Sequence, residues 1–190
     1  MAIEVKRLLT PDDVERMVRC GELDESSFWE FVNGEVVWMA PAFEPQGMIV
    51  MHIATKVVPF ADSIGAYVSD GQAGYWVDHG YRQLRSPDFS LIAGERREMV
   101  RTDAFMRGAP DLAVEVLSKG QLGEACAVEK RDEYFAAGGK VVWIVNPGDK
   151  TVREYIAGGD EYRVYSGDAE ITLDAIAPGF RCPISEFFRY

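Results

Sequence analysis

The chain has 190 residues, which fits one domain spanning 1–190 with a core that needs no disulfide or metal. Its composition, 47% hydrophobic and 12% aromatic, excludes a disordered chain, and a net charge of −11 argues against a protein that coats nucleic acid. The three cysteines are scattered and form no CxxC pair, so they suggest neither a disulfide framework nor a zinc site. No apolar run reaches the roughly 18 residues that span a bilayer, and the N-terminus carries no signal-peptide core. We therefore expect a cytoplasmic protein without membrane contact.

The first predicted elements are a helix and a hairpin. Thr10 can cap a helix that runs from Pro11 to about Cys20, because proline suits the first turn and the two acids that follow favour its positive end. The Asn33-Gly34 pair lies between apolar runs, which is typical of a two-residue hairpin turn. This register places Glu30 opposite Val37.

The middle of the chain alternates between types of element. Apolar spacing predicts a helix over 46–61, and residues 67–84 indicate short strands and turns. Residues 85–92 are interpreted as one strand, and the polar stretch 93–109 as a loop or short helix.

A strand–helix–strand unit follows, formed by a strand at 110–118, a helix at 124–137 and an apolar strand at 141–145 that we expect to be covered on both faces. A right-handed crossover is the default for such a unit. Residues 151–190 form a β-rich tail. The predicted fold class is α/β, or mixed α+β, with one central sheet.

Two acids interrupt the apolar strand at 110–118. Asp111 and Glu115 are four residues apart, and because side chains alternate along a strand, both are expected on one face. Two like charges on a half-buried face need a positive partner, and a divalent metal ion is the commonest one. Asp88 lies in a second Pro-Asp pair on the preceding strand, although both acids could simply begin their strands.

Three further side chains are candidates for the same site. Lys130 can swing from the next helix toward the acids, although its charged neighbours also suit a solvent-facing lysine. Tyr134 lies one turn further along and can pack beside it. Ser118 ends the acid-bearing strand, where it could cap the next segment or bind a phosphate.

These motifs together resemble a known family. PDLAVEVLS, the helical Lys130 and Tyr134, and VVWIVNP resemble the Uma-type putative restriction endonuclease family, part of the PD-(D/E)XK nuclease superfamily. EFVNGEVVWMAP, SPDFSLI and the closing GDAEITLDAIAPGFRCPISEFF are similar to other segments of that family, in the same order.

The resemblance implies a restriction-endonuclease-like mixed sheet flanked by helices, with an N-terminal hairpin and a β-rich tail. It also implies a metal-dependent endonuclease that hydrolyses phosphodiester bonds in DNA with Mg²⁺ or Mn²⁺. Asp88 and Glu115 would be the principal metal ligands, with Asp111 close by. Lys130 would replace the lysine that most of the superfamily carries where this chain has Leu117. Glu30 would be an accessory acid at the same site.

One departure from the family pattern keeps an alternative open. The family usually has a histidine opening the second helix, where this chain has Gln46 and Gly47. His52 lies further into that helix, where it either turns toward the site or packs against the fold. The alternative is therefore a catalytically inactive nuclease fold that binds a partner, with a homodimer as one form. Convergence of Asp88, Glu115 and Lys130 distinguishes the two hypotheses.

Overall fold

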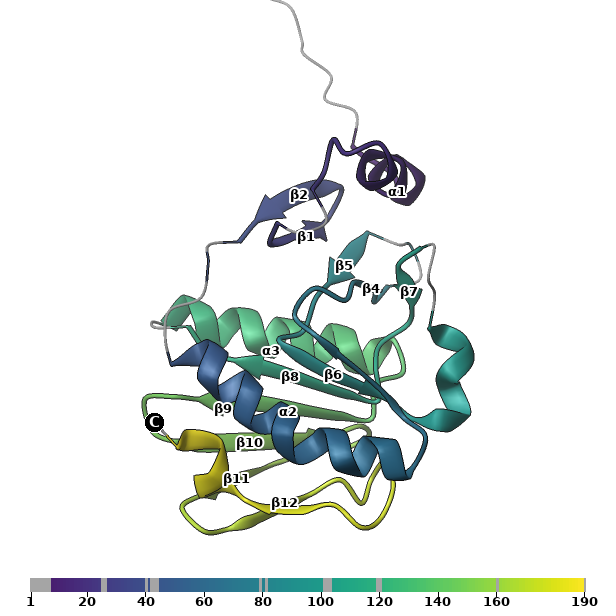
Figure 1. The fold of residues 1–190 in the computed structure, drawn as a ribbon. Helices are drawn as coiled ribbons and strands as arrows, with labels where there is room; N and C mark the ends of the chain where they lie inside the picture. The colour runs from purple at the N-terminus through teal and green to yellow at the C-terminus, as the bar shows by residue number, and fades with distance from the viewer. Residues whose placement is uncertain are drawn as a thin grey trace, which may run out of the picture.

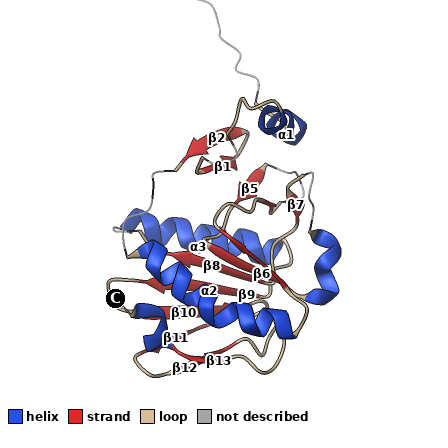
Figure 2. Cartoon of the chain, in the orientation of Figure 1, coloured by secondary structure: helices blue, strands red, loops and turns tan. Residues whose placement is uncertain are grey.

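The computed structural model describes residues 8–24, 27–39, 41, 45–78, 80, 82–100, 104–118, 121–159 and 161–189. Two sheets dominate the fold, with helices packed around the larger one (Figures 1 and 2). The larger sheet has six strands in the order β11-β10-β9-β8-β6-β3, and the smaller has five in the order β2-β1-β5-β4-β7. The expected mixed α/β fold is confirmed, with a second sheet beside the central one.

The N-terminal region forms the helix and hairpin that the sequence predicts. Helix α1 (Pro11–Arg19) begins with a capping box, in which Thr10 and Asp13 bond to each other's backbone amides. Strands β1 (Trp29–Val32) and β2 (Glu35–Trp38) pair in the predicted register, with Glu30 opposite Val37. The turn between them has positive φ at both central residues, which a type I′ hairpin requires and which Asn33-Gly34 tolerates.

Helix α2 (Gln46–Ser63) covers one face of the large sheet (Figure 1). It buries Ile49, Ile53 and Val57, as the apolar spacing predicts, while Phe60 is only partly buried. This packing fixes the N-terminal end of α2, including Gln46, near the loop that precedes strand β6.

The prediction of one strand over 85–92 is wrong. The chain instead leaves β5 (Gln83–Arg85) in the small sheet and enters β6 (Phe89–Ile92) in the large one. Ser86, Pro87 and Asp88 lie between them, and a proline cannot donate to a sheet ladder. The Pro-Asp pair therefore lies where the chain passes from one sheet to the other.

The remaining strands before the crossover are short. Strand β3 (Tyr67–Asp70) pairs with β6, and β4 (Tyr75–Trp76) pairs with β5 and β7 (Met106–Arg107). Between β6 and β7 the chain forms a 3₁₀ helix, η1 (Gly94–Met99). The expected loop or short helix at 93–109 thus contains both a helix and a strand, with 101–103 outside the described residues.

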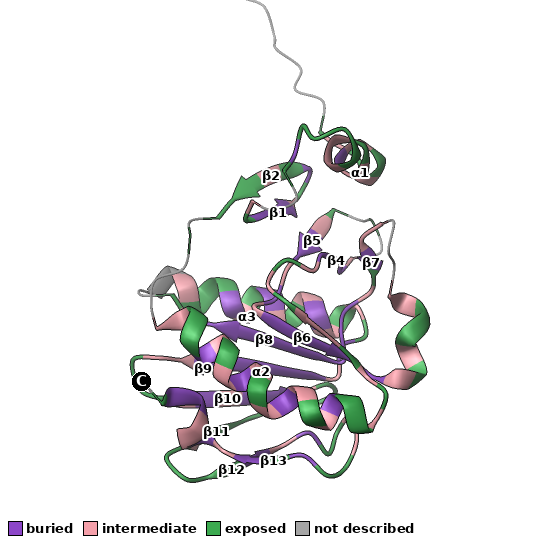
Figure 3. Cartoon of the chain, in the orientation of Figure 1, coloured by how far each residue is buried: buried purple, intermediate pink, exposed green. Residues whose placement is uncertain are grey.

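The predicted strand–helix–strand unit is present. Strand β8 (Leu112–Val116) leads through helix α3 (Gln121–Ala136) to β9 (Val141–Asn146), and β8 and β9 are parallel. Residues 141–145 of β9 are fully buried, consistent with a central strand covered on both faces (Figure 3).

The tail completes the large sheet and closes the core. It comprises β10 (Thr151–Ile156), β11 (Tyr162–Ser166), β12 (Glu170–Thr172), β13 (Arg181–Pro183) and the 3₁₀ helix η2 (Ile184–Phe188). Trp143 packs between Phe180 and Phe187 in this core. Over the described ranges, no helix is long and apolar enough to cross a membrane.

Candidate active site

A cleft of about 650 Å³ lies between the hairpin of the small sheet and the strands and helix of the large one. Four charged side chains line it, each from a different element: Glu30 from β1, Glu115 from β8, Lys130 from α3 and Asp88 from the loop before β6. Four of the side chains that the sequence analysis selected therefore converge at one place.

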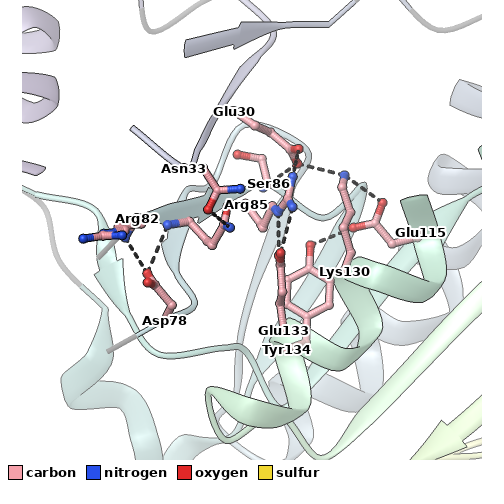
Figure 4. Close-up of polar contacts among 11 residues, drawn as sticks. Glu30, Asn33, Asp78, Arg82, Arg85, Ser86, Glu115, Lys130, Glu133 and Tyr134 are labelled. Carbon is pink, nitrogen blue, oxygen red and sulfur yellow. Dashed lines mark hydrogen bonds and ion pairs between the residues drawn. The ribbon is translucent and has the colours of Figure 1, made fainter. Parts of the chain in front are cut away.

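Glu115 and Lys130 form the centre of this cluster (Figure 4). The Lys130 ammonium lies 3.2 Å from Glu115 Oε2, and the Tyr134 hydroxyl donates to Glu115 Oε1 at 2.7 Å. Lys130 and Tyr134 are four residues apart, so both project from one face of α3 toward β8. All three residues are buried, and each glutamate oxygen is held by a different donor.

A second buried group of charges holds Lys130 from the hairpin side (Figure 4). Lys130 Nζ lies 2.8 Å from Glu30 Oε1, and Arg85 donates to Glu30 Oε2 at 2.9 Å. Arg85 also forms a bidentate pair with Glu133, at 2.6 and 2.9 Å. The antiparallel register of β1 and β5, continued by one pair, places Glu30 opposite Arg85, which explains why the two meet.

Asp88 lies beside the acid-bearing strand and is partly buried. Its Oδ2 accepts a hydrogen bond of 2.7 Å from the amide of Val116, the residue that follows Glu115. The Gln46 side-chain amide lies 3.5 Å from the same oxygen and donates to the Val116 carbonyl at 3.1 Å. Gln46 thus bridges the loop carboxylate and the strand backbone.

The two carboxylates are held in environments that favour protonation. Burial raises the pKa of Glu115 to about 7; Lys130 opposes this rise, and the nearby charges of Asp88 and Glu30 add to it. Burial also raises the pKa of Asp88, opposed chiefly by the Val116 amide and Lys130. Two acids that both resist ionisation have a strong preference for an added positive charge.

Lys130 and Glu30, by contrast, lie where their charged forms are favoured. Burial lowers the pKa of Lys130, but Glu115 and Glu30 outweigh this effect and raise it above its usual range. Burial likewise raises the pKa of Glu30, but Lys130 and Arg85 reverse this and hold it below its ordinary value. Lys130 is therefore a cation at neutral pH, which suits electrostatic stabilisation better than the role of a general base.

The structure places Asp111 apart from this cluster. Asp111 precedes β8, where its fully buried carboxylate accepts from the Ala93 amide at 2.8 Å and pairs with Arg96 at 3.0 Å and Lys140 at 3.1 Å. It does not line the cleft among the described residues. These contacts tie the start of β8 to the loop after β6 and to the start of β9.

The two remaining candidates have different surroundings. His52 projects from α2 to within 3.3 Å of the Phe187 carbonyl of η2, and it is not among the described residues that line the cleft. Ser118 is exposed at the end of β8 and lines the cleft beside Gly123 of α3.

Arg85 and Glu133 belong to the cluster, although sequence reasoning did not select them. Glu133 sits in a run of charged residues that is typical of a solvated helix face, and Arg85 ends a three-residue strand. The one available signal was the spacing of Glu133 in α3, next to Tyr134 and three residues after Lys130. Arg85 reaches Glu133 only because the two sheets pack against each other.

The large mixed sheet thus carries Glu115 on β8, with Asp88 on the adjoining loop and Lys130 on the crossover helix. The crystal structure of a putative nuclease belonging to DUF820 from Anabaena variabilis ATCC 29413 has the same fold, with a TM-score of 0.70 and 19% sequence identity. The match covers 95% of this chain and 97% of that one.

The sequence profile of the Uma2 family, described as putative restriction endonucleases, matches residues 12–185. The chain belongs to this family, which confirms the resemblance of its motifs. No curated protein matches the chain.

Proposed function

We propose that this protein is a metal-dependent endonuclease that hydrolyses phosphodiester bonds in DNA. The observation that carries the proposal is the convergence of Asp88, Glu115 and Lys130 in one cleft. Membership of the Uma2 family supports a nucleic acid substrate. The geometry also favours an enzyme over the inactive alternative, because the charged groups of the site are retained and mutually oriented.

The donor set fits a hard divalent cation, Mg²⁺ or Mn²⁺. Asp88 and Glu115 would hold it, because carboxylate oxygens are the ligands that these ions prefer and Mg²⁺ commonly takes one or two carboxylates and keeps several waters. Among the described residues, no three His, Cys, Asp or Glu side chains are grouped to hold an ion. A bound ion would lower the pKa of its water and polarise the phosphoryl oxygen.

The side chains of this chain have distinct parts in such a reaction. Lys130, held protonated by Glu30 and Glu115, would stabilise the negative charge that develops on the phosphate. Tyr134 fixes one oxygen of Glu115, leaving the other to face the lysine. Arg85 orients Glu30 from behind, so it acts as a positioning residue.

The direct test is cleavage of DNA by the full chain with Mg²⁺ or Mn²⁺. We expect cleavage to be abolished by Glu115→Ala and strongly reduced by Lys130→Ala. Glu129→Ala, which alters an exposed acid of the same helix, is the matched control and should cleave like the wild type. A wild-type protein that neither cleaves DNA nor binds either ion by calorimetry would contradict the proposal.

A further inference from the structure

The cleft has an apolar wall next to its charged floor. Phe28 and Met39 line it, and these two residues are 50% and 43% exposed. The Met39 amide donates to the Phe28 carbonyl at 2.9 Å, which continues the β1–β2 ladder by one pair. Because side chains alternate along a strand, Phe28 and Met39 lie on the same face of the hairpin as Glu30. Exposed apolar side chains therefore adjoin the charged cluster.

The charged groups are at the floor of the cleft. Glu115 is 7% exposed and Lys130 is 5% exposed, so a phosphate must enter the cleft to reach them. A duplex is a stiff rod with its bases stacked inside, whereas an unpaired strand is flexible and can present one phosphate and one base face together. Access to this floor thus favours an unpaired strand.

The charge of the lining points the same way. Among the described residues that line the cleft, Lys130 is the only basic one, and three acids accompany it. Duplex binding depends on many lysine and arginine contacts to phosphates. A cleft with one paired cation must gain affinity elsewhere, and stacking of a base on an aromatic ring supplies it whatever the sequence.

From these observations we infer that the substrate is a single-stranded nucleic acid. One of its unpaired bases stacks on the platform formed by Phe28 and Met39, while the adjoining phosphate reaches Asp88, Glu115 and Lys130. This inference rests on the proposed endonuclease function and narrows its substrate class.

The test compares one DNA sequence as a single strand and as a blunt duplex, cleaved in Mn²⁺ by wild type, Phe28→Ala and Trp38→Ala. Trp38 is the matched control, since it is a 60% exposed aromatic of the same hairpin but lies on the opposite face from Glu30 and outside the cleft lining. A second readout is quenching of 2-aminopurine, placed in the single strand, on binding in EDTA. Phe28→Ala should fold normally, because the bond from Met39 uses only the backbone of residue 28.

We expect faster cleavage of the single strand than of the duplex by wild type. Phe28→Ala should lower kcat/KM on the single strand about ten-fold and remove the quenching, the effect of losing one base stack. Trp38→Ala should retain both. Equal cleavage of the duplex, an absence of quenching with wild type, or identical behaviour of the two variants would overturn the inference while leaving nuclease activity intact. Quenching that depends on Phe28 without any cleavage would overturn the endonuclease proposal and keep single-strand binding.

Discussion

Lys130 Nζ lies 2.8 Å from Glu30 Oε1, so one buried ion pair joins the crossover helix to the N-terminal hairpin. The same ammonium lies 3.2 Å from Glu115. One cation therefore separates two buried carboxylates that belong to different sheets, and the stability of the site depends on that cation.

Replacement of Lys130 by methionine should destabilise the fold. The variant leaves Glu30 and Glu115 buried without their shared counter-charge, and loss of one partner of a buried pair typically costs about 3–5 kcal/mol. We expect a loss of this size in urea unfolding at pH 8. The loss should be smaller at pH 5, because Glu115, with a pKa of about 7, is then protonated.

Lys56 supplies the control for this experiment. It pairs with Glu186 at 2.7 Å, but its side chain is partly exposed to solvent. Lys56→Met should therefore cost about 1 kcal/mol or less. Equal stability of Lys130→Met and wild type at pH 8 would show that the buried carboxylates do not need the lysine.

Glu115 should make the stability of the protein depend on pH. Its pKa is raised from 4.5 to about 7 on folding, so the folded state binds the proton more tightly than the unfolded state. The stability that this group contributes is complete below about pH 4.5 and is lost as the pH rises through 7. In Glu115→Gln the side chain cannot ionise, so this variant should not lose stability through that pH range. Relative to that variant, the wild type should lose about 2–3 kcal/mol of unfolding free energy between pH 5 and pH 8. Parallel pH profiles for the two proteins would refute the raised pKa.

Gln46 should be a positioning residue for Asp88. Its amide donates to the Val116 carbonyl and lies 3.5 Å from Asp88 Oδ2. Hydrogen bonds to charged groups are worth about 1.5–3 kcal/mol, so we expect Gln46→Ala to lower kcat/KM for DNA cleavage about ten-fold. Gln46→His, which retains a ring donor, should preserve most of the activity. Gln72→Ala, which changes another glutamine of the cleft lining, is the control, and an equal effect of both alanine variants would remove the role assigned to Gln46.

Asp111 should stabilise the fold without taking part in the reaction. Asp111→Asn keeps the shape of the side chain but removes the charge that Arg96 and Lys140 contact. We expect thermal unfolding to show a loss of about 3 kcal/mol, with cleavage per folded molecule unchanged. Loss of cleavage at unchanged stability would instead place Asp111 in the reaction.

The sequence could predict those site residues whose direction follows from the local repeat of a strand or helix. Strand alternation selected Glu115, and helical spacing selected Lys130 and Tyr134. The same alternation grouped Asp111 with Glu115, but four residues of strand span about 13 Å, so a shared face did not make a shared site. Arg85 was not predictable, because its burial depends on how two sheets pack.

The fold, too, has features that follow from the local sequence and features that depend on long-range packing. Capping at Thr10, the Asn33-Gly34 turn and the parallel β8–β9 pair follow from short-range signals. The break between β5 and β6 does not, because Ser86-Pro87-Asp88 is short enough to belong to one strand and only the sheet pairing shows that the chain changes sheets. Long-range pairing decided that boundary.

The Arg85 guanidinium binds both Glu133 and Glu30, and this double contact links the charged cluster to the docking of the hairpin. Glu133 belongs to the crossover helix and Glu30 to the hairpin, so the charged cluster is complete only when the hairpin is docked. Any fluctuation that moves the hairpin away therefore breaks up the charged cluster before it disturbs the central sheet. DNA cleavage, the proposed activity, and hydrogen exchange of the β1 amides should therefore respond to the same local opening, and denaturant should abolish cleavage before it unfolds the protein.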